Sequence, residues 1–131
     1  MMRYIFACLL TITVGAFAGV AVAKATPIAG SWAGGGSVKL TSGQVEKVRC
    51  RIRYEKGSGR TVVLYVRCAH SNGTFQVSGR VVKLSKSFYS GRLYSEQYGT
   101  AGDVGISVSG NRQTVKAKSS KGTATVILTK Q

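Results

Sequence analysis

Residues 45–70 read V-E-K-V-R-C-R-I-R-Y-E-K-G-S-G-R-T-V-V-L-Y-V-R-C-A-H, and this stretch decides the fold. Apolar and polar residues alternate on both sides of a glycine-rich centre, which is the pattern of two half-buried strands joined by a turn. A turn centred on Gly57–Gly59 places Tyr54 opposite Leu64, Ile52 opposite Val66 and Cys50 opposite Cys68. One face of this hairpin is therefore apolar. The other face carries Lys47, Arg49, Arg51, Arg53 and Arg67.

Residues 1–23 have the composition of a cleaved secretory signal peptide. Arg3 supplies the basic start, residues 5–22 are apolar or small, and Ala21-Val22-Ala23 fits the cleavage rule. The apolar run is nearly long enough for a transmembrane anchor, but its many small residues favour cleavage. We expect a short flexible lead over residues 24–29, a single domain over residues 30–131, and no transmembrane anchor after cleavage.

The cysteine count supports export and predicts one disulfide. Cys8 would leave with the signal peptide, so the mature chain keeps Cys50 and Cys68. Two cysteines that face each other in an oxidising compartment are expected to form a bond. The alternative is a pair of buried free thiols. We predict a periplasmic or secreted location.

The mature domain is strongly basic. The whole chain has a net charge of +15, and removing Arg3 with the signal peptide leaves +14. Such an imbalance draws a small domain toward anionic surfaces. In a bacterial envelope the candidates are lipopolysaccharide, anionic phospholipid and acidic glycans. The alternative is that the basic surface only aids solubility.

Turn signals place one strand on each side of the central hairpin. Residues 30–41 read G-S-W-A-G-G-G-S-V-K-L-T, and a three-residue turn at 42–44 would set Trp32 opposite Tyr54 and Lys39 opposite Lys47. After the hairpin, Asn72-Gly73 is the strongest two-residue turn signal and would set Phe75 opposite His70.

The strand that follows Asn72-Gly73 continues to about residue 84 with a change of apolar face. Phe75 and Val77 have odd numbers, whereas Val82 and Leu84 have even numbers. A bulge near Gly79 would account for this change.

Four more strands are expected, over residues 88–96, 104–109, 113–119 and 123–129. Residues 97–103 have no pattern and are expected to form a loop. In the last three strands Ile106 faces Val115, and Val115 faces Val126. About eight antiparallel strands joined by tight turns predict an all-β, up-and-down meander that forms a small barrel or half-barrel with one disulfide. The expected interior residues are Trp32, Tyr54, Leu64, Val66 and Phe75.

Two resemblances bear on this fold. Gly30-Ser31-Trp32 resembles the G-x-W start of lipocalins and avidins, in which the tryptophan plugs one end of a barrel. The W-x-G-x-G segment from Trp32, with Arg49-Cys50-Arg51 and Cys68, is similar to small exported alphaproteobacterial β-proteins of unassigned function. The resemblance implies an envelope protein without supplying an activity.

Residues that would support catalysis or a cofactor are scarce. His70 is the only histidine, and Cys68 beside it is expected in a disulfide, so neither a nucleophile pair nor a metal site is predicted. No nucleotide or hydrolase motif occurs. We therefore predict no enzyme activity, no catalytic residues, no cofactor and no metal. Basic residues mixed with aromatics can bind single-stranded nucleic acid. Because an exported protein rarely meets nucleic acid, we do not predict that partner.

The basic strand face is the strongest functional signal in the sequence. Like charges that oppose each other across strands are unfavourable unless an anion, a partner or acidic neighbours compensate. The alternative is a solvated face whose arginine stems cover neighbouring residues. The anion-binding candidates are Lys39, Lys47, Arg49, Arg51, Arg53 and Arg67.

Three functional hypotheses follow. The leading one is a non-enzymatic envelope protein that binds an anionic or amphipathic partner through the basic face. The second is a barrel inhibitor of a secreted hydrolase, with residues 97–103 as the plugging loop and the enzyme as its protein partner. The third is a lipocalin-like carrier of a small hydrophobic ligand, which requires a barrel that its own side chains do not fill.

Overall fold

The computed structural model describes residue 15 and residues 28–131. The rest of the predicted signal peptide and residues 24–27 of the predicted lead lie outside the described residues. No helix long and apolar enough to cross a bilayer occurs among the residues described.

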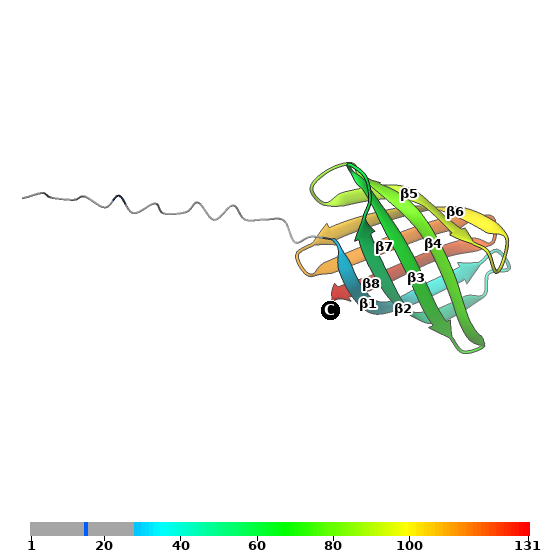
Figure 1. The fold of residues 1–131 in the computed structure, drawn as a ribbon. Coiled ribbons are helices and arrows are strands. Elements are labelled where there is room, and N and C mark those ends of the chain that lie inside the picture. The colour runs from blue at the N-terminus through cyan, green and yellow to red at the C-terminus, as the bar shows by residue number, and fades with distance from the viewer. Residues whose placement is uncertain (1–14, 16–27) are drawn as a thin grey trace, which may run out of the picture.

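Eight antiparallel strands form a closed barrel (Figure 1). Each strand pairs with the next in the sequence, and β8 pairs with β1 to complete the ring. Closure pairs the backbone groups that an open sheet would leave exposed at its edges. The predicted meander is confirmed as a full barrel. The strands are β1 (Gly30–Leu40), β2 (Val45–Lys56), β3 (Thr61–His70), β4 (Gly73–Lys83), β5 (Phe88–Ser95), β6 (Thr100–Ser109), β7 (Arg112–Ser119) and β8 (Gly122–Lys130).

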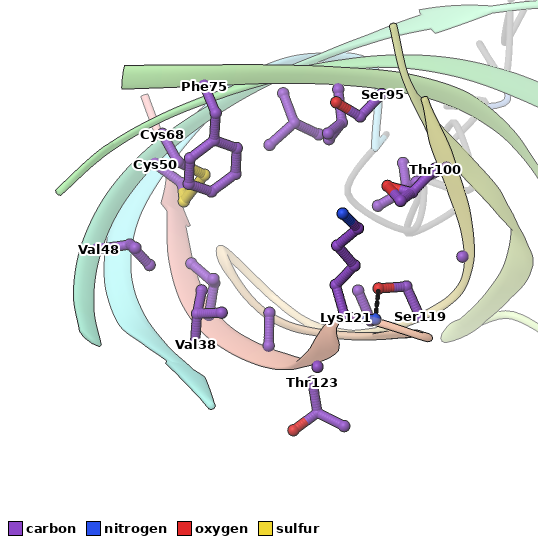
Figure 2. Close-up of a pocket in the computed structure, with 18 of the residues that line it drawn as sticks. Val38, Val48, Cys50, Cys68, Phe75, Ser95, Thr100, Ser119, Lys121 and Thr123 are labelled. Carbon is purple, nitrogen blue, oxygen red and sulfur yellow. Dashed lines mark hydrogen bonds between the residues drawn. A yellow bond between two sulfur atoms is a disulfide. The ribbon is translucent and has the colours of Figure 1, made fainter. Parts of the chain in front are cut away.

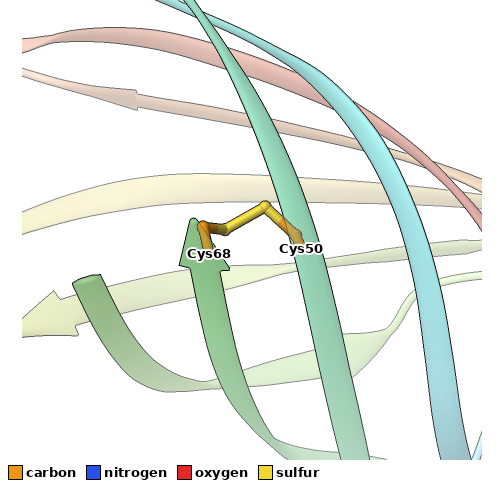
Figure 3. Close-up of a disulfide and its surroundings, with 2 residues drawn as sticks. All are labelled: Cys50 and Cys68. Carbon is orange, nitrogen blue, oxygen red and sulfur yellow. A yellow bond between two sulfur atoms is a disulfide. The ribbon is translucent and has the colours of Figure 1, made fainter. Parts of the chain in front are cut away.

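The central hairpin has the predicted register. Tyr54 pairs with Leu64, Ile52 with Val66, and Cys50 with Cys68. The two cysteines form a disulfide across β2 and β3 with their Cα atoms 4.1 Å apart (Figure 3). The predicted pairings of Val115 with Ile106 and with Val126 are also found.

The turn between β1 and β2 lies one residue earlier than predicted. The loop is Thr41–Gly43, closed by a bond from the Gly43 N–H to the Leu40 carbonyl, and Gly43 has a φ of 91°. Three-residue hairpin loops need a left-handed residue at their last position, where glycine fits best. The strand register therefore shifts by two residues.

This shift corrects the predicted partners of β1. Trp32 pairs with Ile52 in place of Tyr54. Lys39 pairs with Val45, so it does not face Lys47.

The turn between β3 and β4 is also displaced. Its two residues are Ser71 and Asn72, so His70 pairs with Gly73 and Cys68 pairs with Phe75. A two-residue turn at Asn72-Gly73 of type I′, the usual form for this dipeptide, would require Asn72 to adopt a positive φ. No residue other than glycine does so in the described residues, and the positive φ falls on Gly73.

The predicted bulge near Gly79 does not form. Pairing between β3 and β4 runs without interruption, and the odd-numbered side chains of β4 remain inward. Val81 is fully buried, whereas Val82 and Leu84 are 43% and 61% exposed. The bulge was predicted on the assumption that Val82 and Leu84 face inward, whereas they are exposed apolar residues at the end of β4.

The predicted loop over residues 97–103 is mostly strand. The connection between β5 and β6 is Glu96–Gly99, and Thr100 to Asp103 belong to β6. The sequence did not predict this part of the strand, because Ala101 and Gly102 are small and give no alternation of apolar and polar residues. Their backbone is nevertheless paired to β5, and Gly102 is paired to β7 as well.

Candidate functional site: an open cavity at one end of the barrel

Large side chains close one end of the barrel interior. Trp32, Leu64, Ile106 and Leu128 have no exposed surface, and Tyr54 is 2% exposed. The Trp32 indole N–H donates to the Ile28 carbonyl over 2.8 Å, which ties residue 28 to the closed end. Ile28 itself is buried, although it falls within the predicted flexible lead.

One polar pair lies inside this packed end. The Tyr54 hydroxyl donates to the Gln113 amide oxygen, and both side chains are buried. Burial raises the pKa of Tyr54 above its ordinary value of 10.0, so the phenol remains a neutral donor. Gln113 Nε2 has no hydrogen-bond partner. Sequence analysis missed this pair, although Gln113 shares the inward parity of Val115, because a polar residue directly after a turn gives no signal of a buried hydrogen bond.

The opposite end of the barrel is open. A cavity of about 410 Å³ extends from its mouth to the level of Ile52, Val66 and Val115. This volume lies in the usual range of small-molecule sites, about 300–1,000 Å³. Ala117 and Ala124 pair with each other and point into this half of the barrel, and their short side chains leave it unfilled. At the closed end the corresponding inward positions carry bulky side chains.

The cavity has an apolar side and a polar side (Figure 2). Val38, Val48, the disulfide and the Phe75 ring lie on one side. The hydroxyls of Ser95, Thr100 and Ser119, together with Lys121, lie on the other.

Glu46 and His70 form a second polar group at the cavity. His70 Nδ1 lies 3.7 Å from Glu46 Oε2 and accepts a hydrogen bond from the Asn72 backbone N–H over 3.2 Å. The His70 ring also contacts Phe75, with ring centroids 5.9 Å apart. Both acid and imidazole share the inward, even-numbered face of the hairpin. Both residues have even numbers, like the inward-facing Cys50 and Cys68, and this was the sequence signal that could have placed them on the same face.

The predicted interior residues are placed inside the barrel. Trp32, Tyr54, Leu64 and Val66 are buried, and Phe75 is half-buried against the same core. Val66 and Phe75 line the cavity, whereas the other three residues belong to the closed end.

The predicted basic face lies on the outside of β1, β2 and β3. Arg51 pairs directly with Arg67, and Arg53 pairs with Tyr65. Arg53 contacts Glu55 over 3.3 Å and lies 5.1 Å from the centre of the Tyr65 ring. None of the other five basic candidates forms an ion pair with a carboxylate of the described residues; they are Lys39, Lys47, Arg49, Arg51 and Arg67.

No group of three or more His, Cys, Asp or Glu side chains in residues 28–131 is arranged to hold a metal ion. Asp103 faces outward and contacts Arg92 over 2.8 Å, while Glu96 lies in the turn before β6. These two carboxylates therefore do not form a pair in the cavity.

Comparison with known proteins gives the fold alone. No family model matches the chain, and no curated protein matches it. Among solved structures it is similar to a redesigned β-barrel (14% identity, TM-score 0.66, 82% of this chain and 94% of that chain). The redesigned barrel mFAP1, bound to DFHBI, gives 14% identity and a TM-score of 0.66, covering 82% of this chain and 97% of that one. A de novo designed fluorescence-activating β-barrel gives 17% identity and a TM-score of 0.60, covering 79% of this chain and 93% of that one.

Proposed function

We propose that this protein binds a small, largely apolar ligand inside its barrel. The observation that carries the proposal is the cavity of about 410 Å³, which is open at one end and sealed at the other by Trp32 and its neighbours. Concave, mostly apolar sites with a few polar groups are the usual form of small-molecule sites. The protein acts as a carrier or sensor of the ligand, without catalysis.

The same fold argues against the hydrolase-inhibitor hypothesis. That hypothesis used residues 97–103 as the loop that enters an active site. The connection is a short turn, and the residues from Thr100 onward are held in β6.

The proposal is tested with the uncharged fluorophore N-phenyl-1-naphthylamine, whose emission rises in apolar sites. We expect saturable binding to the purified protein. Ala124→Phe adds a ring inside the cavity and should weaken binding at least about tenfold, which corresponds to about 1.4 kcal/mol. Thr125→Phe adds the same ring on the outer face of the same strand and should leave binding unchanged.

Two results would contradict the proposal. The first is an absence of saturable fluorescence enhancement with the unmodified protein. The second is an equal loss of binding in Ala124→Phe and Thr125→Phe, because only the first substitution occupies the cavity. Circular dichroism of both variants checks that the barrel is retained.

A second candidate function rests on the outer basic face. Arg51 and Arg67 face each other across β2 and β3, and neither forms an ion pair with a carboxylate of the described residues. Opposed like charges are stabilised by a bound anion. We propose that this face contacts an anionic envelope component in the periplasm or outside the cell. Salt-dependent binding to anionic vesicles tests it.

A further inference from the structure

We propose that the cavity ligand is an amphipathic anion whose head group binds at Lys121 and whose apolar part enters the barrel. This inference rests on the proposed function and specifies the chemical class of ligand. It is argued from the position of Lys121, from the hydroxyl groups beside it, and from the location of the carboxylate that lines the cavity.

Lys121 lies in the turn between β7 and β8 and reaches across the open end. Its side chain extends over the cavity toward Thr100 and Ser95 (Figure 2). Two hydrogen bonds of the Lys121 backbone hold the turn. The Lys121 N–H donates to the Ser119 side-chain Oγ over 3.1 Å, and the Lys121 carbonyl accepts from the Thr41 N–H over 3.2 Å. The ammonium group forms no ion pair with a carboxylate of the residues described.

The hydroxyls on this side of the cavity are available to donate hydrogen bonds. Ser95 is 5% exposed, and its oxygen accepts a bond from the Tyr98 N–H over 3.3 Å. Ser119 Oγ likewise accepts from the Lys121 N–H. A hydroxyl that accepts in this way retains its own O–H for a ligand. One ammonium and two hydroxyl donors are a suitable set for a carboxylate or phosphate oxygen.

The charge distribution of the lining orients such a ligand. Glu46 comes from β2 and pairs with His70 on β3, whereas Lys121 and Ser119 come from the β7–β8 end of the wall. An anionic head group is repelled by the Glu46 carboxylate and attracted by the Lys121 ammonium. The apolar part then lies along Val38, Val48 and Phe75, and reaches the floor of the cavity.

Displacement of N-phenyl-1-naphthylamine by three ligands with the same ten-carbon chain tests the inference. The ligands are decanoate, decanol and decyltrimethylammonium. We expect decanoate to bind roughly tenfold more tightly than decanol, the effect of one charge-assisted bond of about 1.4 kcal/mol. Lys121→Gln should remove this preference, because decanoate then loses its charge-assisted contact, and Lys121→Glu should shift the preference toward decyltrimethylammonium.

Lys86→Gln is the matched control. Lys86 lies in the turn between β4 and β5, and the substitution removes the same charge from an exposed turn. It should retain the preference for decanoate. Because Lys121 is also exposed and contributes only backbone bonds to the turn, its variants should fold normally.

The outcomes separate the inference from the proposed function. Equal binding of decanoate and decanol, or a preference that survives in Lys121→Gln, would overturn the inference and leave the apolar-ligand proposal in place. A protein that binds neither the fluorophore nor any of the three ligands would overturn both. Loss of the preference in Lys86→Gln as well would assign it to net charge and overturn the role of Lys121.

Discussion

Gln113 illustrates how a single residue can depart from the pattern of its strand. Its amide lies inside the closed end of the barrel and is 1% exposed, where the neighbouring inward positions are apolar. The Tyr54 hydroxyl donates a hydrogen bond to the Gln113 amide oxygen, and this bond reduces the free-energy cost of burying the amide. The pair adds directional specificity to a core that is otherwise held by apolar contacts.

Tyr54 should make the protein sensitive to alkaline pH. The folded state raises the pKa of Tyr54 above 10.0 through desolvation by burial. Above about pH 10 the unfolded chain releases the phenolic proton while the folded chain keeps it, so stability falls as pH rises. The expected slope is about 1.4 kcal/mol per pH unit for this tyrosine, and Tyr89, whose pKa burial also raises, adds to it.

Urea unfolding between about pH 9 and pH 11.5 measures this slope. Tyr54→Phe should have a shallower slope than the unmodified protein. Tyr94→Phe, at a side chain that is 52% exposed, should not. Identical slopes in all three proteins would show that Tyr54 does not contribute.

At the level of the strand, inward glycines permit the tight coiling of this small barrel. A Cβ atom at Gly79 would lie 2.0 Å from the Arg92 carbonyl oxygen on β5, and one at Gly34 would lie 1.9 Å from the Ile127 carbonyl oxygen on β8. Glycine kinks of this kind let sheets curve sharply enough to close. The glycines that weaken an isolated strand are therefore required by the closed structure.

Gly79→Ala should destabilise the barrel by about 1–3 kcal/mol, because the backbone of β5 must move to accommodate the methyl group. Gly105→Ala is the matched control within a strand. Its Cβ would meet only the Phe88 ring, at 3.4 Å. It should change stability by less than about 1 kcal/mol, in the stabilising direction. Thermal or urea unfolding measures both values, and equal effects would argue against close strand approach at Gly79.

For the whole molecule, the dominant feature is an excess of positive charge over a closed barrel. The described residues contain four carboxylate side chains, and three of them contact basic residues. Most of the remaining basic groups lie on the outer face, where they repel one another and attract anions. Two functions at different places are compatible with this arrangement: a ligand inside the barrel and an anionic surface outside it.

Binding to vesicles of phosphatidylglycerol should depend on both salt and the outer basic face. We expect binding at low ionic strength and its loss as the Debye length shrinks from about 10 Å at 0.1 M to about 3 Å at 1 M salt. Replacing Arg49, Arg51 and Arg53 by serine should weaken it more than replacing Arg112, Lys116 and Lys118, which removes equal charge from β7. Equal losses would indicate attraction by net charge alone.

The sequence by itself determined the local features. Alternation over residues 45–70 and the symmetry of the glycine turn were enough to pair Cys50 with Cys68, because strand register follows from periodicity and turn position. Where the turn position was ambiguous, as around Gly43, the sequence predicted the correct inward face of the strand, but the predicted partner on the next strand was wrong by two residues. A shift of two residues preserves side-chain direction, so only contacts between strands reveal it.

Only the tertiary structure decided what the barrel contains and what its open end presents. The cavity exists because the bulky inward residues gather at one end, while Ala117 and Ala124 leave the other end unfilled. Lys121 is an ordinary turn residue in the sequence, and it becomes a candidate ligand contact only when ring closure sets its turn over the cavity. Alternation assigns side chains to the inside or the outside of a sheet. The volume left inside depends on side chains from all eight strands meeting at once.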